Sequence, residues 1–408
     1  MAANPIDSTP VMALLSSATR ALPANRPSGR LIQLDILRGF LLVWMTLTHL
    51  PTKASIVSNQ TFGFVSGAEG FIFLSAFMVG QLEYRIEQKR GEAATVRDLI
   101  KRTFRVYLYH CGLLLVAFTL VAEIGHQFHR LALENLLSFY LQSPKPAVIA
   151  AALLEYRPSL LDILPIYVIF LALTPLARKA ARRWSWDVVI YTSFGVWACA
   201  QFGLRHWIYT HVNLFGLGVP ETSTGAFDLY SWQLLWMVGL ALGSIYADRL
   251  TGNAPAGTGI PRWLLKLCGG LALIFLVLRY SPVDHWMDPN VYGWLIDKWH
   301  LGPARVINFS ALTILVVRYG TRIAKFPIFS PLASLGQASI EVFSVHVLCC
   351  LAGDALSRDA DPHLPWWQQT LLLIFTMAAL FLTAQAQKRF GKKARAARAA
   401  ASAAAPAS

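Results

Sequence analysis

The sequence has little charge and none of the common motifs of soluble nucleotide-binding enzymes and hydrolases. Only 14% of its 408 residues are charged, whereas 55% are hydrophobic. It has no G-x-S-x-G, Walker or dinucleotide-binding glycine motif, so the usual sequence signals for those enzyme classes are missing. A water-soluble core would not need so much apolar sequence, and the composition predicts an all-α, polytopic membrane protein.

Metal and disulfide signals are missing as well. The five cysteines lie in apolar segments and form no C-x-x-C pair, and no histidines show metal-ligand spacing. We therefore expect neither a bound metal nor a disulfide framework. The net charge of +14 does not indicate a nucleic-acid partner, because the basic residues fall in short clusters between apolar segments rather than on one soluble domain.

The apolar segments predict about ten membrane-spanning helices between two tails. Residues 1–29 are predicted to be a disordered cytoplasmic tail, 30–387 the transmembrane domain, and 388–408 a basic low-complexity cytoplasmic tail. Residues 92–103, 130–142 and 284–299 have the pattern of amphipathic or interfacial helices. The ten predicted spans are 31–50, 62–82, 104–124, 158–177, 187–205, 229–247, 263–280, 304–320, 331–352 and 365–387.

Orientation follows from the distribution of Lys and Arg. If the N-terminus is cytoplasmic, most of the 36 Lys and Arg residues fall in cytoplasmic stretches. The positive-inside rule therefore predicts that both termini are cytoplasmic. The apolar segments make the lipid bilayer an expected partner of the protein.

Ionisable residues in the first two spans are the main functional signal. On a helix, Arg38 and His49 lie about 20° apart in projection and roughly 16 Å apart along the axis, with Asp35 on the same side. The second span adds Glu69. Charge inside a membrane costs several kcal/mol and marks a functional site by default. The structural alternatives are that Asp35 and Arg38 neutralise each other and that His49 is an ordinary interfacial histidine.

These residues also carry a family resemblance. The resemblance lies in three patterns: R-x-x-x-x-D-x-L-R-G, an arginine and a histidine spaced as R-x10-H, and G-A-E-x-F-x-F-L-S. In these patterns the sequence resembles the OpgC family, membrane acyltransferases that succinylate osmoregulated periplasmic glucans, and more distantly the acyltransferase-3 superfamily. One departure is Ala76 after Ser75, where the family commonly has glycine. The residues concerned are Arg30, Asp35, Leu37, Arg38, Gly39, His49, Gly67, Ala68, Glu69, Phe71, Phe73, Leu74 and Ser75.

The ninth span holds a second polar set in the sequence GQASIEVFSVH. Ser339 and His346 are seven residues apart and share one helix face. Interhelical hydrogen bonding is the structural explanation. The resembled family has a histidine at the corresponding position, which makes His346 a secondary site candidate, with Ser339 and Ser75 in substrate-binding or supporting roles.

Two functions fit these observations. The resemblance implies an acyltransferase of the bacterial inner membrane that uses an acyl-CoA, succinyl-CoA in this family, and a periplasmic glucan acceptor. In that reading His49 is the general base, Glu69 orients it, and Arg38 with Asp35 binds the coenzyme. The alternative is a secondary transporter that uses the same four groups as an ion or proton relay. The sequence shows no second copy of the LDxLRG segment, whereas transporters usually contain repeats.

Overall fold

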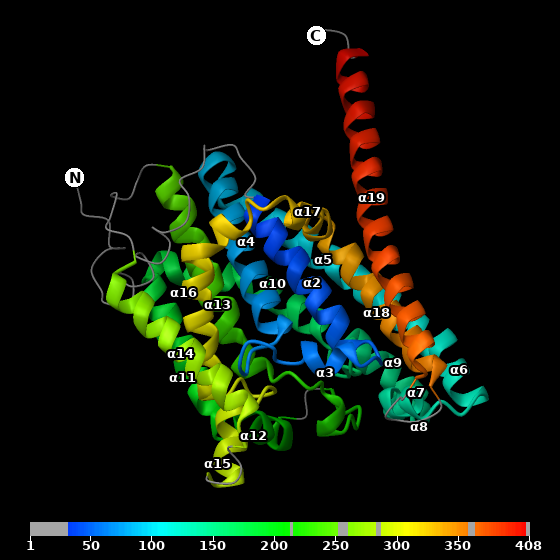
Figure 1. Ribbon diagram of the computed structural model, residues 1–408. Helices are drawn as coiled ribbons and strands as arrows, with labels where there is room; N and C mark the ends of the chain where they lie inside the picture. The colour runs from blue at the N-terminus through cyan, green and yellow to red at the C-terminus, as the bar shows by residue number, and fades with distance from the viewer. Residues whose placement is uncertain (1–31, 213–214, 252–259, 283–286, 358–363, 405–408) are drawn as a thin grey trace.

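Helices form the whole of the regular secondary structure in the residues described by the computed structural model, 32–212, 215–251, 260–282, 287–357 and 364–404. The long helices form a bundle, and α19 extends beyond it on one side (Figure 1). They are α2 (Ile32–His49), α4 (Gly67–Arg90), α5 (Glu92–Val116), α10 (Ile163–Arg183), α11 (Trp186–Gln201), α13 (Leu229–Leu250), α14 (Arg262–Tyr280), α16 (Pro303–Ile323), α18 (Ser339–Leu356) and α19 (Trp366–Ala404).

Short helices lie at both ends of the bundle. We call the end at which α2 finishes the His49 end; it is the lower end in Figure 1 and holds most of them. The opposite end holds η5 (Pro327–Phe329) and α17 (Ser330–Gln337). The short helices at the His49 end are α3 (Ala54–Ser58), α6 (Ala122–Gln127), α7 (Leu131–Leu136), α8 (Ser138–Gln142), α9 (Pro144–Ala152), α12 (Leu204–His211), η3 (Glu221–Ser223) and α15 (Pro289–Ile296).

Every predicted span corresponds to helix, and five of the described helices are long and apolar enough to cross a membrane. The count of ten spans and their orientation remain predictions. The predicted N-terminal tail lies outside the described residues. The five helices are Glu92–Gln127, Ile163–Arg183, Arg262–Tyr280, Ser339–Leu356 and Trp366–Gly391.

Two boundaries differ from the prediction. Residues 92–103 are not a separate interfacial helix, because α5 continues from Glu92 through the next span and a π-helical turn, η2 (Ala117–Val121), into α6. No proline or glycine interrupts the segment 92–103, so nothing there ends the helix. The predicted span 331–352 is instead two helices, α17 and α18, which meet at Ala338.

Glycines set the two closest helix contacts. On α13, a Cβ at Gly243 would lie 2.0 Å from the carbonyl oxygen of Phe77, and one at Gly239 would lie 3.0 Å from the Cβ of Ala76. The close approach of α4 and α13 at Ala76 is therefore provided by glycine on α13. On α17, a Cβ at Gly336 would lie 1.9 Å from the carbonyl oxygen of Asp35, which fixes α17 directly against α2.

Candidate functional site

The polar face of α2 turns into the bundle. Asp35 is buried, and its backbone packs against Gly336. The guanidinium of Arg38 lies 5.8 Å from the ring centroid of Phe71, and its Nη1 is 3.5 Å from the sulfur of Met78 on α4. Asp35 and Arg38 are thus held between α2, α4 and α17, near the end of the bundle opposite His49.

His49 and His346 lie side by side. Their ring centroids are 5.6 Å apart, although the two residues are almost 300 positions apart in sequence. His346 is buried, and its Nδ1 is 3.5 Å from the sulfur of Cys350. His49 contacts the backbone of Met45, and its Nδ1 is buried. The pair joins the end of α2 to the middle of α18.

A row of aromatic rings connects the two halves of the predicted site. Phe71 of α4 stacks on Phe343 of α18 at a centroid distance of 5.9 Å, and Phe343 contacts His346 at 5.5 Å. With Arg38 against Phe71 and His49 against His346, contacts run continuously from the predicted coenzyme-binding residue to the predicted base.

Glu69 has partners other than His49. Its Oε2 accepts hydrogen bonds from the backbone nitrogen and Oγ of Ser66, at 3.0 and 2.5 Å, and so closes a capping box at the start of α4. Its Oε1 accepts from Nε of Arg305 at 3.0 Å and also from Nη2 of Arg305. Both side chains of this ion pair are 0% exposed.

No hydrogen bond joins Glu69 to His49, the residue that it is predicted to orient. Both carboxylate oxygens face donors from Ser66 and Arg305, which leaves no acceptor directed at His49. Sequence analysis missed Arg305, which comes 236 residues after Glu69. The sequence feature that could have identified Arg305 is its place in the first turn of an apolar segment, where an unpaired charge is costly.

Lys298 is a second cation that the sequence analysis did not single out. It lies in the loop between α15 and α16, and its charge acts on His49 as well as on Glu69, Arg305 and Asp162. Lys298 therefore brings His49 and the Glu69–Arg305 pair into one electrostatic neighbourhood at the His49 end. Burial lowers the pKa of the Lys298 ammonium.

The two predicted serines lie on α4 and α18. Ser75 is buried in α4, and its Oγ has no hydrogen-bond partner among the described residues. Ser339 is the first residue of α18, two turns before His346. No interaction of either serine with His49 is formed in the structure, so their supporting roles remain predictions.

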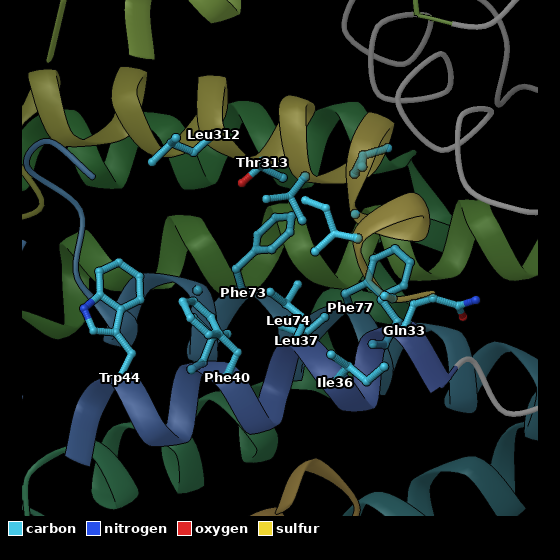
Figure 2. A pocket seen from close by; sticks show the side chains of 18 of the residues that line it. Gln33, Ile36, Leu37, Phe40, Trp44, Phe73, Leu74, Phe77, Leu312 and Thr313 are labelled. Carbon is cyan, nitrogen blue, oxygen red and sulfur yellow. The ribbon is translucent and has the colours of Figure 1, made fainter. Parts of the chain in front are cut away.

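A cavity of about 570 Å³ lies on the opposite face of α2. Figure 2 shows Phe40 and Trp44 of α2 and Phe73 of α4 pointing into the space below Leu312 and Thr313 of α16. Its lining is almost entirely apolar and includes none of Asp35, Arg38, His49 or Glu69. It is therefore separate from the predicted site and unsuited to the phosphates of a coenzyme.

Comparison with known proteins identifies the family. A family model described as OpgC protein matches residues 30–392, which is most of the chain. The chain belongs to the OpgC family. No curated protein and no solved structure matches it.

Membership in the OpgC family implies a role in glucan succinylation and suggests an acyltransferase. The apolar helices of membrane-spanning length agree with a multi-pass membrane protein of this family. The matched region contains the LDILRG segment, the histidine pair and the buried Glu69–Arg305 ion pair.

Proposed function

We propose that this OpgC protein transfers a succinyl group from cytoplasmic succinyl-CoA to hydroxyl groups of a periplasmic glucan, in the inner membrane of a bacterium. The family match supports the reaction class. The observation that carries the proposal is the pair of histidines, His49 and His346, at one end of a helical bundle. Acyl transfer to a hydroxyl requires a base, and a second polar group beside the base can hold it in place.

His49 is the proposed general base. Its imidazole accepts the proton of an acceptor hydroxyl while the hydroxyl oxygen attacks the thioester carbonyl carbon. When the tetrahedral intermediate collapses, the carbon–sulfur bond breaks, and the proton passes from His49 to the departing thiolate. The products are the succinyl ester and free coenzyme A, so atoms and charges balance. The adjacent ring of His346 supports this assignment.

Arg38, with Asp35, is the proposed coenzyme site. A guanidinium binds phosphate oxygens through two parallel hydrogen bonds, which an ammonium cannot reproduce. Arg38 precedes His49 by three helical turns, about 16 Å along the axis. A pantetheine arm bridges a separation of this order, and the row formed by Phe71, Phe343 and His346 connects the two places.

Glu69 has a positioning role in this proposal. Through Arg305 it joins the start of α4 to the start of α16, and through Ser66 it caps α4. Lys298 lies among these groups and His49. Loss of Glu69 is therefore expected to disturb the arrangement around His49 rather than to remove a proton carrier. Ser75, Ser339 and His346 have substrate-binding or supporting roles in this proposal.

Ten spans with both termini in the cytoplasm complete the proposal. In this orientation the His49 end faces the periplasm and Arg38 lies toward the cytoplasm. The start of α2 and the end of α19 point to the same side of the bundle (Figure 1), which supports an even number of crossings. A reporter fused to the C-terminus that is active only in the periplasm should be inactive, and an active one would contradict the orientation.

The test of function is direct. The purified protein is mixed with succinyl-CoA, acetyl-CoA or other thioesters and a periplasmic glucan preparation. We expect thiol release to match the formation of succinyl esters detected by mass spectrometry. Thioester consumption without ester would contradict glucan acylation. Proton-coupled uptake of a solute into vesicles, with no acyl transfer, would favour the transporter alternative.

A further inference from the structure

The loop that carries Lys298 is fixed from several directions. Leu301 is fully buried although its φ is +51°, a conformation that a leucine rarely adopts unless its surroundings impose it. The side chain of Asp297 accepts from the backbone nitrogen of Trp299 at 2.8 Å and pairs with Nδ1 of His300 at 2.5 Å. Such a loop holds its lysine in one place.

Neighbouring helices hold the same loop through its carbonyl groups. The oxygen of Trp299 accepts from the backbone nitrogen of Asp228 and from Nε1 of Trp232, both at 3.0 Å. Two side chains of α11 donate as well. Nε2 of Gln201 donates to the carbonyl oxygen of His300 at 2.7 Å, and Nε1 of Trp197 donates to that of Leu301 at 2.9 Å. The position of Lys298 is therefore built into the fold.

The ammonium of Lys298 has aromatic neighbours but no anion bound to it. Its Nζ lies 4.9 Å from the ring centroid of Trp299 and 5.7 Å from that of Phe227. No hydrogen bond or ion pair joins it to any other described residue. Glu69, whose charge acts on Lys298, is already bound to Arg305 and Ser66.

Positive charge exceeds negative charge around Lys298. Asp162, the other carboxylate near it, accepts from the backbone nitrogen of Ala226 at 3.2 Å and also faces Arg157. Arg157 has two buried nitrogens, Nε and Nη1, without hydrogen-bond partners in the described chain. Lys298, Arg305 and Arg157 are thus three cations near two carboxylates, Glu69 and Asp162. Arg205 and Asp228, whose charges act on Arg157, add one charge of each sign, and the carboxylate of Asp297 in the same loop is paired with His300.

We propose that Lys298, supported by Arg157, binds the free carboxylate of the acyl group and so selects a dicarboxylic acyl thioester over a neutral one. This inference rests on the proposed acyl transfer at His49. A succinyl group carries a carboxylate two methylene groups from the reacting carbonyl, whereas an acetyl group has none. Because an anion in a largely buried site is costly without a cation, and a buried cation is costly without an anion, this contact discriminates between the two donors.

The test compares wild type with Lys298→Met, which keeps the length of the side chain and removes its charge. Lys145→Met, at an exposed lysine of α9 at the same end, is the matched control. Full-length proteins in lipid nanodiscs are used in two assays. Calorimetry gives the Kd for succinyl-CoA and acetyl-CoA, and thiol release with glucan gives kcat/KM for each donor.

We expect wild type and Lys145→Met to prefer succinyl-CoA in both assays. Lys298→Met should lose about 30-fold or more of its kcat/KM for succinyl-CoA, because one partner of a buried charge contact is removed, and should keep that for acetyl-CoA. Retained acetyl-CoA binding shows that the variant is folded.

Equal losses for the two donors, or no loss, would overturn the assignment of Lys298. Equal binding of both donors by wild type would overturn it as well, whatever the turnover. Wild type that binds succinyl-CoA preferentially but forms no glucan ester would instead contradict only the proposed function, and the binding of Lys298→Met would still decide the role of Lys298.

Discussion

The buried ion pair between Glu69 and Arg305 offers the sharpest stability prediction. Both side chains are 0% exposed, so Arg305→Met leaves a carboxylate buried without its cation. Removing one partner of such a pair typically costs about 3–5 kcal/mol. We expect a loss of this size in the free energy of unfolding, measured by SDS titration of the protein in mixed micelles with tryptophan fluorescence.

The double variant separates pairing from packing. Glu69→Gln alone is also destabilising, because both carboxylate oxygens of Glu69 accept hydrogen bonds and an amide offers a donor at one of those two places. Glu69→Gln with Arg305→Met leaves no buried charge, so its cost should be clearly less than the sum of the single costs.

Arg97→Met, at an exposed arginine of α5, is the control and should change the unfolding free energy by no more than about 0.5 kcal/mol. An Arg305→Met protein within about 1 kcal/mol of wild type would refute the reasoning, since a buried and uncompensated carboxylate cannot be that inexpensive.

Three further predictions follow from other contacts. Gly336→Ala should sharply reduce the folded yield, because its Cβ would lie 1.9 Å from the oxygen of Asp35; Gly112→Ala, with open space, should be tolerated, and equal yields would contradict the helix contact. The hydrogen bond to Asp297 raises the pKa of His300, so protonated His300 stabilises the fold at pH below about 6.5 and this contribution, a fraction of 1 kcal/mol, disappears as pH rises through the raised pKa; His300→Gln should flatten that part of the stability–pH curve, and an unchanged curve would contradict the pairing. Arg38→Lys should weaken binding of coenzyme A by about tenfold or more in calorimetry, because the planar fork is lost; unchanged affinity would exclude bidentate phosphate binding.

The helices could be predicted from the sequence because each apolar segment is long and is bounded by polar or basic residues close to it in the sequence. The break at Ala338 could not, because it depends on how α17 packs through Gly336 against the backbone of Asp35. That contact joins residues about 300 positions apart, and helical periodicity carries no information about it.

The site was predictable only in part, for the same reason. Periodicity placed Asp35, Arg38 and His49 on one face of a helix, and the structure turns that face into the bundle. It could not pair Glu69 with Arg305 or bring Lys298 near His49, because those partners come from a distant span and from a loop between helices. Costly buried charge indicated that Glu69 needs a partner, but not which one.

The central claim is that His49 is the base in acyl transfer, and turnover per folded molecule of His49→Ala tests it most directly. His126→Ala, at an exposed histidine of α6, is the control. We expect His49→Ala to be folded, to bind succinyl-CoA, and to lose about 100-fold or more of the rate of glucan ester formation, while His126→Ala retains the wild-type rate. A His49→Ala protein with near-normal turnover would contradict the account.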